Sequence, residues 1–198
     1  MTMIPERPTS AFVGAPPGPD RDHPDGTRIA LRPQPCWVGR AVRLRVIESD
    51  DRRTLMRFDR EGDPGLVEGY RHWAAHRANH RRCADDFQLG IETLAGGRLV
   101  GSMCTTQTEP GAGRFSYGIG VGPEFQRHGY ACDAIGILLR YMFEHRRYLK
   151  CEVGIYGHNV PSLRLHRKIG FREEQHEPHV RARYLVLMGI TRAEWADR

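Results

Sequence analysis

The stretch Arg114-Phe-Ser-Tyr-Gly-Ile-Gly-Val-Gly-Pro-Glu-Phe-Gln-Arg-His-Gly-Tyr-Ala-Cys-Asp-Ala134 decides the fold of this 198-residue chain. Its first part alternates large apolar residues with small ones from Phe115 to Val121, which predicts a strand with one apolar face. The opposite face carries glycines from Gly118 to Gly122. A bare strand face of this kind suits a place where another backbone or a ligand lies close.

The second part of the stretch predicts a phosphate-binding turn. Pro123 ends the strand, and the residues from Gln126 to Ala131 supply main-chain N–H groups at the start of a helix. Gly129 and Ala131 add little bulk there. Because the helix dipole reinforces these N–H groups, the turn is expected to bind a phosphate group.

Composition and charge narrow the class of protein. Lys and Arg number 30 and Asp and Glu 24, a net charge of +6, which allows an anionic ligand but is also ordinary for a soluble surface. No nucleic-acid recognition motif is present, so a nucleic-acid binder rests on charge alone. The five cysteines show no CxxC spacing, which favours a reducing cytoplasm. No apolar run long enough to span a membrane, and no signal-peptide core, is seen.

The chain divides near residue 35. Eight of the thirteen prolines lie in residues 1–35, which predicts a disordered or extended tail, since such a segment buries little apolar surface. An inert tail, an arm that docks a partner, and a tail that packs on the second subunit of a homodimer are the three interpretations. Residues 36–198 are expected to form one globular domain.

Hydrophobic periodicity predicts a mixed α/β domain with the order β-α-α-β-β-β-α-β-α-β-β. The expected strands are 41–47, 85–93, 99–107, 114–121, 149–156, one that begins at Phe171, and 183–190. The expected helices are 52–60, 66–82, 127–147 and 158–170, with a terminal turn after Thr191.

Two motifs carry a family resemblance. Gln126-x-x-Gly129-x-Ala131, and the run from Asn159 through Ser162 to Lys168-x-Gly170-Phe171, resemble the GNAT superfamily of N-acetyltransferases over about residues 40–195. The branch that includes the ribosomal-protein N-terminal acetyltransferases is the most similar. The resemblance implies a mostly antiparallel sheet of about six to seven strands, flanked by about four helices, with a splayed slot for an acyl-CoA.

The resemblance also implies acetyl-CoA as the co-substrate, with no metal. Its pantetheine arm is expected along Ile119, Gly120 and Val121, where an N–H group near Val121 acts as the oxyanion donor. Asn159 and Ser162 are expected on the far side of the arm. The expected pyrophosphate cradle comprises Arg127, His128, Gly129, Tyr130, Ala131 and Cys132, and Gln126 is also expected to bind the cofactor. Cys132 is interpreted as a packing or backbone contact, because direct transfer needs no covalent enzyme intermediate.

The acid and base positions depart from the family pattern. Many relatives have a tyrosine where His166 stands, seven residues after the asparagine, and His166 can protonate a thiolate. The alternative for His166 is a partly exposed helix histidine. Some relatives place a base glutamate where Gly154 stands, so Glu152 and Glu92 are the candidates. Either can instead be a solvated or salt-bridged carboxylate, and a water chain can replace both.

The leading function is therefore acetyl transfer from acetyl-CoA to a primary amine of a small molecule or a protein N-terminus. A catalytically inactive CoA-binding module is the alternative, because the family tyrosine and glutamate are absent. His72, His76 and His80 share one face of the expected helix 66–82, but surrounding arginines argue against a metal site. The acceptor is expected to be selected by residues 52–82 and 175–183.

Overall fold

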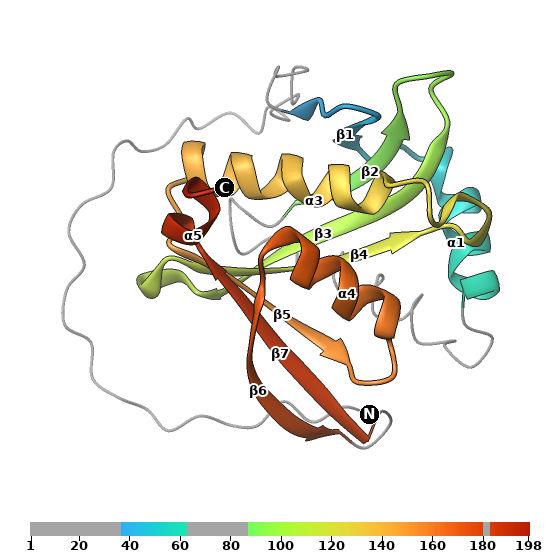
Figure 1. The fold of residues 1–198 in the computed structure, drawn as a ribbon. Coiled ribbons are helices and arrows are strands. Elements are labelled where there is room, and N and C mark those ends of the chain that lie inside the picture. Colours follow the sequence, from blue (N-terminus) through green and yellow to red (C-terminus); the bar gives the residue numbers. More distant parts are fainter. Residues whose placement is uncertain (1–36, 63–86, 180–182) are drawn as a thin grey trace, which may run out of the picture. The chain divides into compact units, whose positions relative to one another are not determined.

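Seven strands form one sheet with the order β1-β2-β3-β4-β5-β7-β6, in which only the β4–β5 pair is parallel (Figure 1). The computed structural model describes residues 37–62, 87–179 and 183–198. The tail expected over 1–35 and the helix expected over 66–82, with its histidines, lie outside these ranges. The strands are β1 Val42–Val46, β2 Gln88–Thr93, β3 Leu99–Glu109, β4 Arg114–Val121, β5 Lys150–Tyr156, β6 Arg172–His179 and β7 Arg183–Thr191.

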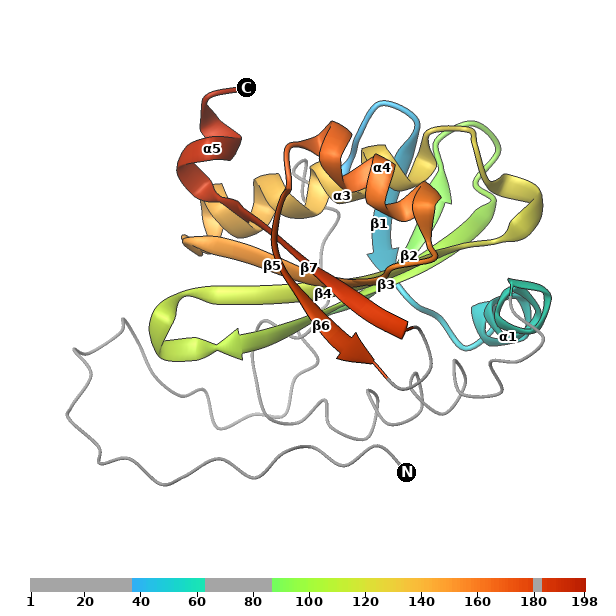
Figure 2. The same cartoon turned by 60° about the horizontal axis from the view of Figure 1, so that its bottom comes forward.

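The described helices lie on both faces of the sheet. Figure 2 shows α3 and α4 over one face and α1 at the other. Their bounds are α1 Asp51–Gly62, α3 Tyr130–Arg140, α4 Val160–Ile169 and α5 Arg192–Ala196. No helix among the described residues has the length and apolar character needed to cross a membrane.

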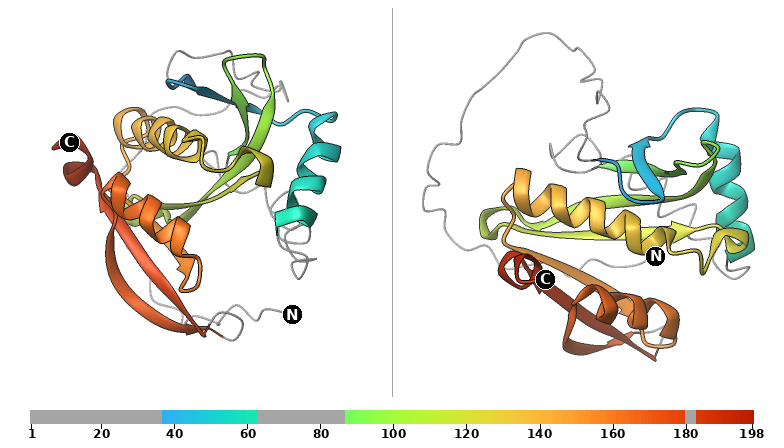
Figure 3. Two further views of the ribbon diagram at one scale, coloured as in Figure 1. Left: turned by 45° about the vertical axis from the view of Figure 1, so that its right-hand side comes forward. Right: turned by 45° about the horizontal axis from the view of Figure 1, so that its top comes forward.

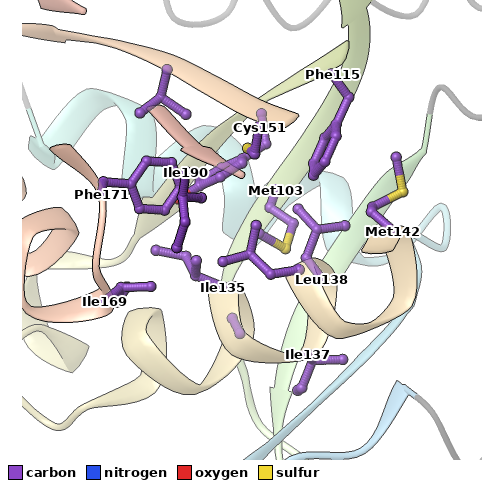
Figure 4. Close-up of a cluster of buried hydrophobic side chains, with 14 of the residues drawn as sticks. Met103, Phe115, Ile135, Ile137, Leu138, Met142, Cys151, Ile169, Phe171 and Ile190 are labelled. Atoms are coloured by element: carbon purple, nitrogen blue, oxygen red, sulfur yellow. The ribbon is translucent and has the colours of Figure 1, made fainter. Parts of the chain in front are cut away.

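The hydrophobic core fills the space between the sheet and α3 (Figure 4). On β4 the alternation places Phe115 inside, fully buried, and α3 presents Ile135 and Leu138 to it, also fully buried. Each such side chain contributes about 1.5–3 kcal/mol on burial. The core therefore fixes β4 and α3 relative to each other, and with them the turn that joins the two elements.

Local signals set the ends of the other helices. The side chain of Asn159 accepts a hydrogen bond from Ser162 N at 3.2 Å, which caps the start of α4. Gly170, with φ 102°, ends the same helix in the left-handed conformation that glycine favours. Thr191 and Glu194 form a reciprocal capping box at α5.

The expected fold class is confirmed, with seven strands and four helices in the described residues. The helix expected over 127–147 is shorter at both ends. It begins at Tyr130, because Arg127 and Gly129 have positive φ angles of 68° and 83°. After Arg140 the chain continues as a wider π-helical turn, Tyr141–His145, which sequence periodicity does not distinguish from an α-helix.

Candidate active site

The strands β4 and β5 pair at one end and then diverge (Figures 1 and 3). Among the described residues their register contains only Arg114 opposite Lys150 and Phe115 opposite Cys151. Beyond Phe115, no described strand lies beside the edge of β4 that faces β5. The sheet therefore contains the splayed slot that the sequence resemblance implies.

The direction of the β4 main chain decides which residues face this gap. Gly122 N donates to Val100 O of β3 at 2.9 Å, so the even-numbered residues of this stretch direct their N–H groups toward β3. Because the direction alternates along a strand, the N–H groups of Ile119 and Val121 face the gap. Gly120 instead pairs with Ser102 of β3. Of the three predicted pantetheine contacts, only Ile119 and Val121 thus offer N–H groups to a ligand in the gap.

A cavity of about 450 Å³ opens at this gap and joins β4, the start of α3 and the first turns of α4. None of its described lining residues is Asp or Glu. All of the predicted cofactor residues except Gly120 and His128 line it. The lining residues are Ile119, Val121, Phe125, Gln126, Arg127, Gly129, Tyr130, Ala131, Cys132, Asn159, Pro161, Ser162, Leu165 and Lys168.

The start of α3 presents unpaired N–H groups at this cavity. The first main-chain hydrogen bond of the helix runs from Asp133 N to Gly129 O at 3.1 Å, and no side chain caps the helix. The preceding N–H groups, from Tyr130 to Cys132, therefore have no helical acceptor. A Cβ built on Gly129 meets no atom within 4 Å, so the space in front of the turn is open. Such a helix start is suited to bind phosphate.

His128 lies outside the cavity lining and supports the turn instead. Its Nδ1 lies 2.8 Å from Gln126 O, and its ring stacks on Tyr130 with centroids 5.6 Å apart. The outer edge of the turn is held from α1. The ring of Phe58 meets Phe125 edge-on at 5.9 Å, and Arg57 forms an ion pair with Glu124 at 3.0 Å.

His166 is buried, with 3% of its surface exposed, rather than partly exposed as in the alternative interpretation. Its Nε2 lies 2.9 Å from the hydroxyl of Tyr117, and its Nδ1 lies 2.8 Å from Ser162 O. Burial lowers the pKa of His166, against the smaller raising effect of the Ser162 carbonyl. The side chain is thus neutral at neutral pH and, unlike its α4 neighbours Ser162 and Leu165, does not line the cavity.

The two carboxylates predicted as base candidates lie outside the cavity lining. Glu152 forms ion pairs with Lys150 at 2.9 Å and Arg114 at 3.1 Å. Glu92 is buried and forms ion pairs with Arg43 and Arg45. Burial by itself would raise the pKa of Glu92, but the two guanidinium groups outweigh it and lower the pKa. The ion pairs favour the salt-bridged interpretation, and a base role for either carboxylate stays a prediction.

Sequence reasoning gave no role to Lys168, which lines the cavity together with Leu165 and Pro161. The signal was present, because Ser162, Leu165 and Lys168 follow one another at three-residue intervals and so lie near one another on α4. Lys168 and Arg127 place two cationic side chains at the cavity. This charge complements a phosphate-bearing ligand.

Comparisons with known proteins agree with this geometry. Residues 41–172 match the acetyltransferase (GNAT) domain family. The SPbeta prophage-derived uncharacterized N-acetyltransferase YokL of Bacillus subtilis (strain 168) is 28% identical over 149 residues, which cover 70% of this chain and 80% of the relative.

Two solved structures have the same fold. A spermidine N-acetyltransferase from Vibrio cholerae, in complex with CoA and spermine, has a TM-score of 0.66 and 20% identity, covering 78% of this chain and 98% of that one. An acetyltransferase (GNAT family) from Bacillus anthracis has a TM-score of 0.65 and 19% identity, covering 79% and 98%.

Proposed function

This chain belongs to the GNAT family of acetyltransferases, and on that premise we propose that it transfers an acetyl group from acetyl-CoA directly to a primary amine. The acceptor is a small molecule or a protein N-terminus. One observation carries the proposal: the gap-facing N–H groups of β4 and the unpaired N–H groups at the start of α3 open into the same cavity.

The residues of the cavity fit the parts of acetyl-CoA. The N–H groups from Tyr130 to Cys132 would hold the pyrophosphate, with Arg127 and Lys168 supplying positive charge. The pantetheine arm would lie along Ile119 and Val121 of β4 in the manner of an added strand. Asn159 and Ser162, at the start of α4, also line the cavity and would flank the arm on its far side.

The chemistry that this arrangement supports is direct nucleophilic attack. A neutral amine attacks the thioester carbonyl, the carbonyl oxygen becomes an oxyanion, and the CoA sulfur leaves. A gap-facing N–H group near Val121 would stabilise the oxyanion, an effect worth about 10²–10³ in rate for one donor. Cys132 lines the cavity but would serve as a packing or backbone contact rather than as a nucleophile.

Two further observations support the proposed location of the enzyme and the class of its acceptor. Among the described residues, Cys104, Cys132 and Cys151 take part in no disulfide, which supports a cytoplasmic location. The solved structure that contains CoA and spermine supports polyamines as one class of acceptor.

The test is release of CoA thiol from acetyl-CoA with a panel of amines, with mass spectrometry of the products. The panel pairs spermine and spermidine with short peptides that bear a free N-terminus. We expect acetylation of at least one class, and the class that reacts decides between the two acceptors. Tight CoA binding by calorimetry without acetylation of any amine would favour a CoA-binding module over an enzyme.

A further inference from the structure

The hydrogen bonds around His166 fix its protonation. The carbonyl oxygen of Ser162 can only accept, so Nδ1 of His166 carries the proton that is donated across 2.8 Å. In the neutral ring Nε2 is then the acceptor, and the hydroxyl of Tyr117 donates to it at 2.9 Å. The two rings are stacked, with an interplanar angle of 18°. Tyr117 and His166 therefore form an oriented pair, in which the proton of the hydroxyl points at the imidazole.

The pair adjoins residues that line the cavity. Tyr117 precedes the lining residue Ile119 on the same face of β4, and His166 follows the lining residues Ser162 and Leu165 on α4. Phe171 meets the His166 ring edge-on at 5.1 Å.

The proposed reaction needs a group that can both accept and return one proton. When an amine replaces the CoA sulfur on the acetyl carbon, the nitrogen loses a proton and the sulfur gains one. No described residue that lines the cavity is a carboxylate, and Glu92 and Glu152 are held in ion pairs outside it. Among the described residues, Tyr117 and His166 form a buried, hydrogen-bonded pair that adjoins the cavity lining. The proposed contacts with the cofactor give this pair no function.

We propose that Tyr117 and His166 act as one proton-transfer pair in this acetyl transfer, an inference that rests on the function proposed above. The nitrogen lone pair forms the C–N bond, the nitrogen gives its proton to the Tyr117 oxygen, and the Tyr117 proton passes to Nε2 of His166. The C–S bond then breaks with its electron pair on sulfur. The proton returns from His166 through Tyr117 to the sulfur, so the pair ends as it began.

Burial gives both groups suitable properties. It raises the pKa of Tyr117 well above its ordinary value, so the hydroxyl does not rest as a phenolate and serves only to pass protons on. It lowers the pKa of His166, so an imidazolium formed there is more acidic than an ordinary imidazolium and returns its proton more readily. Because nitrogen and sulfur are bonded to the same carbon in the intermediate, one hydroxyl can serve both atoms.

The experiment compares Tyr117→Phe, His166→Gln and the double variant with the unaltered chain. We expect kcat to fall by about 10²-fold or more in each single variant, the range of general acid–base catalysis, with the acetyl-CoA dissociation constant unchanged. The double variant should be no slower than the slower single one, because the two residues act as a unit. The solvent deuterium isotope effect on kcat should also change in all three.

The choice of glutamine separates proton transfer from support. Its amide oxygen can accept a hydrogen bond from the Tyr117 hydroxyl but cannot hold a proton during the reaction. An unchanged kcat in His166→Gln would therefore overturn the proposal. Tyr148→Phe is the matched control, because Tyr148 is also buried but packs against Phe115 at the paired end of β4. If Tyr117→Phe keeps full activity and the unaltered chain is active, the proton-transfer pair would be refuted but the proposed function would stand. If the unaltered chain transfers no acetyl group, the proposed function itself would be refuted.

Discussion

Gly39 leaves room for the carboxylate of Asp133, since a Cβ at Gly39 would lie 2.5 Å from Oδ1 of Asp133. That carboxylate accepts hydrogen bonds from three successive N–H groups, Arg40 at 3.0 Å, Ala41 at 2.7 Å and Val42 at 3.0 Å. Asp133 follows Cys132 in the first turn of α3. The contact therefore ties the start of β1 to the helix whose first N–H groups face the cavity.

Asp133→Ala should lower the free energy of unfolding by about 2–4 kcal/mol, because part-buried N–H groups lose their acceptor. Asp133→Asn, which keeps one carbonyl oxygen, should lose less. Gly39→Ala should destabilise the unaltered chain and cost little more in the Asp133→Ala background, since the clash partner is then gone. Denaturant unfolding of the four variants tests this, and equal costs of Gly39→Ala in both backgrounds would contradict the contact.

Gly129→Trp should abolish acetyl-CoA binding, because its side chain would occupy the open space in front of the α3 N-terminus. Gly96→Trp is the matched control. Gly96 has a φ of 85° against 83° at Gly129, and both have no atom within 4 Å of a built Cβ. The backbone strain is thus alike, but Gly96 does not line the cavity. Calorimetry should show lost binding only for Gly129→Trp, and equal affinity in the two variants would argue against the cradle.

Phe58→Ala should weaken acetyl-CoA binding from outside the cavity. The Phe58 ring supports Phe125 and lies against Gly122, where a built Cβ would be 2.7 Å from it. Its loss should cost about 3–5 kcal/mol of stability, as for other buried phenylalanines, and loosen the turn that leads into α3. Arg57→Ala removes an exposed ion pair and a cation–π contact 5.2 Å above the Phe58 ring but leaves that ring in place, so it should lower affinity and stability much less. Calorimetry and thermal unfolding check both.

Acid should destabilise the fold through the ion-pair network of Arg45 with Asp51 and Glu92. A hydrogen bond from Arg45 lowers the pKa of Asp51, and the pKa of Glu92 is lowered by Arg45 and Arg43 against the effect of burial. Both folded pKa values therefore lie below the ordinary unfolded values of about 4. The stabilisation is present above about pH 4 and is lost as the pH falls through the folded pKa values.

Arg45→Met tests this dependence directly. It should cost about 3–5 kcal/mol at pH 7, because it leaves two poorly exposed carboxylates with fewer partners. Its unfolding free energy should then vary less between pH 6 and acid, since the carboxylate pKa values return toward their ordinary range. Arg57→Met, at an exposed pair, should keep the unaltered acid dependence. A parallel loss of stability with pH in Arg45→Met and the unaltered chain would count against the network.

The strands and the phosphate-binding turn could be predicted because their signals are local, whereas the roles of Asn159 and Ser162 were implied by the family resemblance. Alternation along 114–121 and the glycine-containing turn after Pro123 are both readable from neighbouring residues. The partners of His166 and Glu92 could not be predicted in this way, because Tyr117 lies 49 positions from His166 and Arg43 lies 49 positions from Glu92. Only the register of the sheet and the placement of α4 bring these residues together. The shortened α3 was missed because a positive φ at Arg127 has no signature in residue type.

Because β4 and β5 diverge, the seven-stranded sheet consists of two halves that are joined where these two strands pair. Strands β1 to β4 form one half and β5, β7 and β6 the other, and within the described residues their register joins them only at Arg114 and Phe115. An acetyl-CoA arm bonded to Ile119 and Val121 and flanked by α4 would bridge both halves. The substrate would then be a structural member of the sheet as well as a reactant, and each turnover would stiffen the molecule and release it again.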